Sequence, residues 1–280
     1  MHPAEPVVTP WQANLLLGFA RRGDGTLLIR REHSGPLRVQ KPLYPEGPGT
    51  CHAIVLHPPA GIAGGDELQI RAELGPGTHA LLTTPGAGKW YGSAGPWAVQ
   101  HLAFAVADDA CLEWLPQETI AFDGARAAME TRVDLASGAR YLGWEILCLG
   151  RRARGERFDR GELRLETRIS RDGVPLFLER GRLSGGDPLL NSPAGLAGYS
   201  VCGTLAATGA VAGEMLSECR SVAPPEPGAQ WGVTAPPGLL LARFLGHSSE
   251  AARRWFADLW QVLRPALAGR PAMPPRIWNT

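Results

Sequence analysis

Several residue types that could do chemistry occur in this sequence, but their spacing does not match established catalytic motifs. The segment Thr84–Trp90 combines two glycines with Lys89, as a loop that cradles phosphate groups would. The phosphate-loop pattern also requires a glycine and a serine or threonine at the positions that Thr83 and Trp90 occupy. We therefore exclude a nucleoside triphosphate site in this segment.

A nucleophilic serine is the second candidate, and it fails at one position. The segment Gly198–Cys202 follows the motif that presents a catalytic serine until Cys202, which stands where a glycine lets a strand turn sharply into a helix. The sequence also lacks the paired-histidine motif of zinc proteases, the glycine-rich fingerprint of dinucleotide binding and a calcium loop. We find no recognisable catalytic machinery.

Histidine and cysteine could bind a transition metal, so their spacing in 51–57 matters. On a strand, Cys51 and His52 point to opposite faces, whereas Cys51 and His57 share a face about 20 Å apart at ~3.3 Å per residue. No chelate can form locally. A site that gathers His79 or His101 from other strands stays open, although satisfied or exposed histidines are the favoured interpretation.

Composition narrows the possible functions further. The chain has 280 residues and a formal charge of +1, which argues against binding to nucleic acid. Its longest apolar stretches end well before the ~18 residues that a membrane span needs, so no membrane contact is expected. The five cysteines lack Cys-x-x-Cys spacing, and no basic region followed by an apolar core opens the chain. These features predict reduced thiols and a cytoplasmic protein.

Short alternating runs separated by turn residues predict a mainly β protein. In 162–169 charged residues alternate with a second set that predicts a buried face opposite a solvated one. That second set is Leu163, Leu165, Thr167 and Ile169. Three hairpins are expected: Leu15–Arg22 with Thr26–Arg31, Ala127–Leu135 with Arg140–Leu149, and Glu162–Ile169 with Val174–Glu179. Further strands are expected at Cys51–His57, Glu67–Leu74, His79–Thr83, Ala98–Ala107, Met215–Val222 and Leu239–Leu245.

One segment, about 248–268, predicts a helix. Ser248 or Ser249 can cap its start, Glu250 favours the first turn, and Pro265 limits its length. Its apolar stripe consists of Trp255, Phe256, Leu259, Trp260 and Leu263. Segments 185–198 and 223–238 are expected to be loops, residues 1–10 to be flexible, and residues 1–280 to form a single domain.

Several motifs, read together and in order, resemble the urease accessory protein UreD family, also called UreH. The resemblance runs from about Trp11 to Thr280, and the agreement of several independent motifs makes it specific. The motifs are Gly35–Leu37, Pro45–Glu46, Pro58–Asp66, Thr83–Lys89, Leu112–Thr119, Pro175–Arg180 and Pro274–Thr280.

This resemblance implies a non-enzymatic cytoplasmic chaperone. A member of the family is expected to dock on the apo-urease structural subunits and to join the accessory protein UreF and the GTPase UreG. No tightly bound cofactor is implied, only transient Ni²⁺. The implied fold is a mainly β stack of helically winding strand layers with one or two helices, the clearest near the C-terminus.

A nickel passage requires oxygen or nitrogen groups that hold the ion weakly enough to release it. The family motifs place acidic residues at Asp66, Glu67, Glu145 and Glu179, and we predict that these four line the route. Each has a structural alternative. Asp66 could cap the turn after a glycine, Glu67 and Glu145 could be solvated, and Glu179 could pair with an arginine.

Five further residues are predicted to bind partners: Lys89, Tyr91, Glu118, Trp255 and Trp260. Lys89 could instead contact a neighbouring carboxylate, and Glu118 could bind loop backbone. The two helical tryptophans could equally belong to the core.

A β-sandwich carbohydrate-binding module is the alternative function, because nine tryptophans accompany many hairpins. Sugar binding would require an aromatic platform on one sheet face. Trp90, Trp97, Trp114, Trp144 and Trp231 lie in separate segments, so the sequence indicates no such platform.

Overall fold

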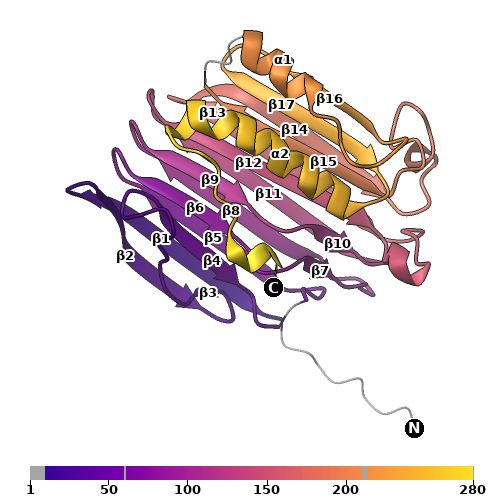
Figure 1. Ribbon diagram of the computed structural model, residues 1–280. Coiled ribbons are helices and arrows are strands. Elements are labelled where there is room, and N and C mark those ends of the chain that lie inside the picture. The colour runs from indigo at the N-terminus through magenta and orange to yellow at the C-terminus, as the bar shows by residue number, and fades with distance from the viewer. Residues whose placement is uncertain (1–9, 60, 210–212, 280) are drawn as a thin grey trace.

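The computed structural model describes residues 10–59, 61–209 and 213–279, arranged as two stacked β-sheets with one long helix on the outer face of the second sheet (Figure 1). The segment 1–10, expected to be flexible, lies outside this description except for residue 10. The first sheet has the order β14 (Val174–Ser184), β13 (Glu162–Arg171), β11 (Arg126–Leu135), β8 (Ala98–Val106), β5 (Glu67–Leu74), β1 (Gln12–Arg22) and β2 (Gly25–Ser34).

The second sheet faces the first. Its order is β16 (Gln230–Thr234), β17 (Leu239–Gly246), β15 (Val201–Thr208), β12 (Arg140–Leu149), β9 (Cys111–Leu115), β6 (His79–Thr83), β4 (Cys51–Leu56) and β3 (Arg38–Val39). The short strand β10 (Thr119–Ala121) pairs with β12 and with β7 (Gly88–Trp90). The helices are α1 (Gly213–Ser221) and α2 (Ser249–Ala268), with 3₁₀ turns at Arg152–Arg154, Pro188–Leu190 and Arg276–Asn279.

The chain winds between the two sheets and advances by one strand with each turn. From β4 onward it alternates sheets through β5, β6, β8, β9, β11, β12 and β13, so that neighbouring strands within each sheet run parallel. Parallel neighbours need a crossover connection, and here the opposite sheet supplies it. The predicted stack of helically winding strand layers is therefore confirmed.

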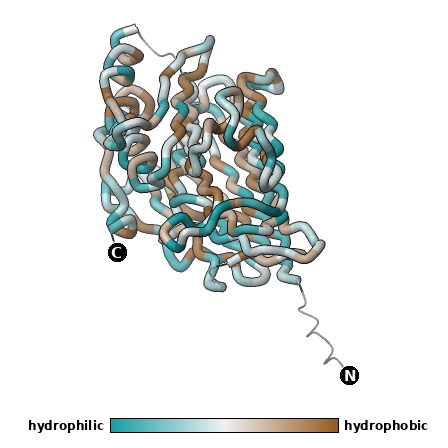
Figure 2. Tube along the Cα trace, turned by 90° about the vertical axis from the view of Figure 1, so that its right-hand side faces the viewer, coloured by the Kyte–Doolittle hydropathy of each residue, from teal (hydrophilic) through white to brown (hydrophobic). Residues whose placement is uncertain are grey.

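The two sheets differ in how they are buried. Strand β5 alternates buried and solvated residues, because the first sheet contacts protein on one face only. Strands β6 and β9 are buried at every position, because the second sheet packs against the first sheet on one side and against α2 on the other. Figure 2 shows hydrophobic segments mostly in the interior of the molecule and hydrophilic segments mostly at its periphery.

Helix α2 begins as predicted, with Ser248 accepting a hydrogen bond from the Ala251 amide at 3.1 Å. Pro265 does not end it. The proline lies in the last turn, and the helix continues to Ala268 before Gly269 adopts a left-handed conformation at φ 66°. A proline in the last turn removes only one internal hydrogen bond, which the packing of the apolar stripe offsets.

Three local predictions are wrong, at least in part. The strands 127–135 and 140–149 exist, but they lie in different sheets and form no hairpin. The segment 215–222 is not a strand, because it lies largely in α1. Met215, Leu216 and Cys219 recur at helical spacing there, and Cys219 packs against the core beneath α2. The expected loop 223–238 contains β16, whereas 185–198 has only a 3₁₀ turn.

Candidate functional site

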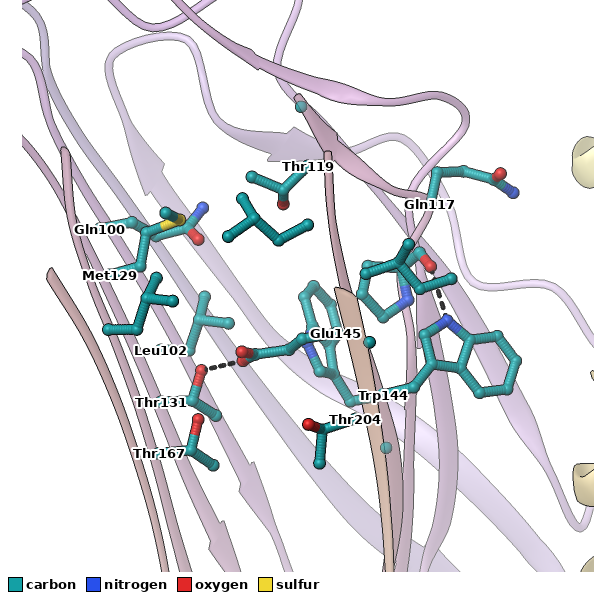
Figure 3. A pocket seen from close by; sticks show the side chains of 18 of the residues that line it. Gln100, Leu102, Gln117, Thr119, Met129, Thr131, Trp144, Glu145, Thr167 and Thr204 are labelled. Carbon is teal, nitrogen blue, oxygen red and sulfur yellow. Dashed lines mark hydrogen bonds between the residues drawn. The ribbon is translucent and has the colours of Figure 1, made fainter. Parts of the chain in front are cut away.

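A cavity of about 670 Å³ lies between the two sheets. Its lining residues come from β5, β8, β11, β13 and β14 of the first sheet and from β4, β9, β12, β15 and β17 of the second. The cavity therefore runs across the strands instead of along one of them. Its walls are mostly apolar, and the polar groups at its centre are Gln100, Thr119, Thr131, Glu145, Thr167 and Thr204 (Figure 3).

Glu145 projects from β12 into this cavity. The Thr131 hydroxyl on β11 of the opposite sheet donates a hydrogen bond to its carboxylate at 2.5 Å, and Thr167 and Thr204 lie close by (Figure 3). Burial raises the pKa of Glu145 above its ordinary value. Glu179 raises it further, whereas the hydrogen bond from Thr131 opposes the rise. The side chain nevertheless keeps a solvent-accessible surface, because it faces the cavity and not packed protein.

Glu179 lies where the cavity reaches the edge of the sheets. Its carboxylate pairs at 2.5 Å with the Arg243 guanidinium, so β14 of the first sheet is linked to β17 of the second. Arg243 also lies 3.4 Å from the Thr204 hydroxyl. Both charged side chains are partly exposed, so solvent screens this ion pair.

The structure does not gather the other two predicted carboxylates with these. Asp66 is buried outside the cavity lining, and its carboxylate accepts hydrogen bonds from the Trp11 and Ala63 amides at 2.8 Å. Asp66 acts electrostatically on His57, which lines the cavity. Burial lowers the pKa of His57, and the negative charge of Asp66 opposes this effect without cancelling it. Glu67 begins β5 and is exposed on the outer face of the first sheet.

The predicted partner-binding residues fall into two groups. Lys89 lines the cavity from β7, Tyr91 follows it with 38 % of its surface exposed, and Glu118 lies half-buried before β10. Trp255 and Trp260 of α2 are fully buried against the second sheet. These two indoles therefore present no surface to a partner in this structure.

The tryptophans form no exposed platform. Trp90, Trp114 and Trp144 are each at most 4 % exposed, while Trp97 is stacked with Arg126 and Arg164. The exposed Trp11 precedes β1 of the first sheet, and the exposed Trp231 lies on β16 of the second. Nothing in their arrangement favours carbohydrate binding.

A buried ionic cluster under α2 escaped the sequence analysis. Arg264 is 1 % exposed and contacts Glu113 on β9 at 3.0 Å and Glu46 at 2.6 Å. His79 lies 2.6 Å from Glu113, and His52 lies 2.6 Å from Glu46. Two features of the sequence could have indicated this cluster. Glu113 interrupts the apolar run Cys111–Leu115, and Arg264 lies on the apolar face of the predicted helix.

This cluster ties stability to pH. Burial acts to raise the pKa of Glu46, but hydrogen bonds from His52 and Arg264 outweigh it and lower the pKa from 4.5 to about 2. The pKa of buried Glu113 is lowered as well, because His79 and Arg264 outweigh its desolvation. Since folding lowers both pKa values, both carboxylates stabilise the fold above their unfolded pKa, and this contribution is lost as pH falls.

We therefore expect stability to decline as the pH falls from about 4.5 to about 2, by up to about 3 kcal/mol for Glu46 alone. Urea unfolding at a series of acidic pH values measures this decline. Glu46→Gln is expected to flatten the profile, and Glu214→Gln at an exposed position of α1 serves as the matched control. Parallel profiles for the Glu46 variant and the unsubstituted chain would contradict the assignment.

Among the described residues, no three or more histidine, cysteine, aspartate or glutamate side chains are grouped so as to hold a metal ion. No helix in the described part of the chain is both long and apolar enough to cross a membrane.

Comparison with known proteins identifies the family. The family model for "UreD urease accessory protein" matches residues 12–279, almost the whole of the described chain. This chain belongs to the UreD family. The family description is that of an accessory protein, not of a catalyst.

Relatives from several bacteria agree over their full lengths. "Urease accessory protein UreD" of Dechloromonas aromatica (strain RCB) is 59% identical, with 99% of this chain and 98% of the relative covered. The UreD of Azoarcus sp. (strain BH72) is 54% identical over 100% of this chain and 97% of the relative. That of Pseudomonas fluorescens (strain Pf0-1) is 51% identical, with 99% and 98% covered. The winding two-sheet fold is therefore that of a UreD protein.

Proposed function

We propose that this UreD protein helps to load nickel into apo-urease, acting in the cytoplasm with UreF and the GTPase UreG. In this proposal the cavity between the sheets is the route that Ni²⁺ follows. The supporting observation is Glu145, a carboxylate held between the two sheets by Thr131 and facing a space wide enough for water.

The chemistry of the lining suits an ion in transit. Hydroxyl, amide and carboxylate oxygens near Glu145 can replace part of the hydration shell of the ion, and isolated oxygen ligands bind it weakly enough to release it. Glu179 offers a second carboxylate where the cavity reaches the sheet edge, although Arg243 must give way for it to bind a cation. Of the other two predicted carboxylates, Asp66 stays a proposed contributor through its electrostatic influence on His57, which lines the cavity. Glu67 lies on the outer face of the first sheet, away from the proposed route.

Replacing Glu145 by glutamine tests the proposal. We expect nickel-dependent activation of apo-urease to fall by about tenfold or more, because the central carboxylate is lost. Folding raises the pKa of Glu145, so its ionised form costs stability at high pH; the variant is therefore expected to unfold at a higher urea concentration near about pH 8. Unchanged activation by the folded variant would refute the route.

Glu130→Gln provides the matched control. Glu130 lies on β11 beside Thr131 but is exposed on the outer face of the sheet, where it pairs with His101 at 2.9 Å. Its substitution is expected to leave activation unchanged. Copurification of both variants with apo-urease separates a defect in the route from a defect in docking.

A further inference from the structure

The connection between β12 and β13 concentrates positive charge. Residues 151–160, which we call the arginine loop, contain five arginines against Glu156 and Asp159. The arginines are Arg151, Arg152, Arg154, Arg157 and Arg160. The chain as a whole has a formal charge of only +1, so this loop stands out from the rest of the sequence.

Asp123 fixes one end of the arginine loop. Its carboxylate accepts hydrogen bonds from the amides of Asp159 at 2.9 Å and Arg160 at 2.8 Å. The Arg160 guanidinium pairs with the same carboxylate at 2.8 Å. The charge of Arg160 is thus used within the chain.

Glu156 fixes the other end. Its carboxylate accepts hydrogen bonds from the amides of Asp123 and Arg151 at 3.2 Å and pairs with the Arg151 guanidinium. Phe158, 4 % exposed, anchors the loop in the core between the sheets. These contacts hold the loop backbone in place, and the other three arginines of the loop take no part in them.

Three guanidinium groups project from this fixed backbone. Arg152 and Arg154 are exposed, and neither side chain forms a hydrogen bond or an ion pair with any described residue. Within the described part of the chain, the Arg157 guanidinium pairs only with Asp159, at 3.6 Å, and both side chains are more than 60% exposed. Because the backbone of the arginine loop is already fixed, binding a partner would cost little further conformational entropy. The unpaired guanidinium groups can form bidentate hydrogen bonds to carboxylates.

An exposed aromatic residue extends this surface. The Arg151 guanidinium lies 4.4 Å from the centre of the Phe122 ring. The centres of the Tyr91 and Phe122 rings lie 5.1 Å apart, with the ring planes 66° from parallel. Tyrosine and arginine are among the residues enriched in protein interfaces. Phe122 directly follows β10, which pairs with β7. Thr119 of β10 and Lys89 of β7 both line the cavity. The surface therefore borders the cavity, beside β7 and β10 in Figure 1.

We propose that the arginine loop together with Tyr91 is a docking surface for a carboxylate-bearing protein surface, namely an acidic patch on apo-urease. This inference rests on the proposed function and adds the place and the chemistry of docking. The near-neutral net charge and the compact shape of the loop disfavour a nucleic acid, whose backbone requires an extended basic track.

The test compares two charge reversals in the full-length chain. Arg152→Glu with Arg154→Glu removes the free charges but leaves the anchoring arginines. Arg22→Glu with Arg38→Glu is the matched control, because both positions are exposed on β1 and β3 and make no ion pair with a described residue. Binding to immobilised apo-urease is measured at about 50 mM and about 300 mM salt. Equal melting temperatures verify that both variants fold.

We expect the loop variant to associate about tenfold more slowly at low salt and to lose most of its salt dependence, while the control behaves as the unsubstituted chain does. Equal binding by the loop variant and the control would overturn the inference. If the loop variant failed to fold, Arg152→Gln with Arg154→Gln would replace it.

Two further probes separate this inference from the proposed function. If the unsubstituted chain does not bind apo-urease, the proposed function fails. Retention of the chain on immobilised polyglutamate then tests separately whether the arginine loop recognises carboxylates. Weaker retention of the loop variant than of the control would then support carboxylate recognition, and equal retention would overturn it. A loss confined to binding of duplex RNA would also overturn it.

Discussion

Replacing Arg264 by methionine is expected to lower the free energy of unfolding by about 3–5 kcal/mol. Methionine keeps an unbranched apolar stem and a similar helix propensity but lacks the guanidinium group and its charge. Glu113 and Glu46 would then remain buried under α2 without the guanidinium that contacts both. Two carboxylates in a low-dielectric interior repel each other and lose their solvation, so the fold bears a large cost.

Urea unfolding monitored by tryptophan fluorescence measures this loss. Arg254→Met on the same helix is the control, because the Arg254 side chain is 63% exposed and forms a solvent-exposed ion pair with Glu250 one turn away. The control is expected to change stability by less than about 0.5 kcal/mol. A similar small effect at Arg264 would show that the two carboxylates are protonated or hydrated in the fold.

Obstructing the cavity is expected to abolish nickel-dependent urease activation while the chain still binds apo-urease. Thr131 and Thr204 project from opposite sheets toward Glu145 (Figure 3), so tryptophan at both positions places two indoles across the middle of the cavity. Each indole brings about 150–250 Å² of surface. The open volume accommodates them at a cost below about 3 kcal/mol.

The matched variant carries valine at both positions. Valine has nearly the shape of threonine, so the cavity stays open although the hydroxyl that donates to Glu145 is lost. We expect this chain to retain much of the activation and the tryptophan chain to fall to the level without any accessory protein. Full activation by a folded tryptophan chain would refute passage through the cavity.

Local residue patterns were sufficient to predict a strand where one face of that strand is solvated. The alternation in 162–169 predicted β13 and its hairpin partner β14, because the first sheet leaves its outer face in water. The same reasoning failed for 136–139. Local residues predicted a tight hairpin there, but the chain crosses to the other sheet, and Arg171 from β13 donates to the carbonyl groups of Ala136 and Ala139.

The strand β9 shows why buried strands are harder to predict. Its five residues are all buried, so no alternation marks which face meets the first sheet and which meets α2. Glu113 therefore could not be assigned to the face that binds Arg264, a residue 151 positions later in the chain. Contacts across such a separation depend on how the elements pack and not on any local period.

The sequence alone determined a mainly β protein with a capped helix near the C-terminus, because alternation and capping residues are local signals. The ordered motifs indicated the family, and only that resemblance implied the winding strand layers. Only the tertiary structure decided which carboxylates meet. On β12 nearly every position is buried, so the fold decides that Glu145 faces the cavity between the sheets. Asp66 and Glu67 are adjacent in sequence, yet the first is bound to backbone amides and the second lies in solvent, because successive residues at a strand start point to opposite sides.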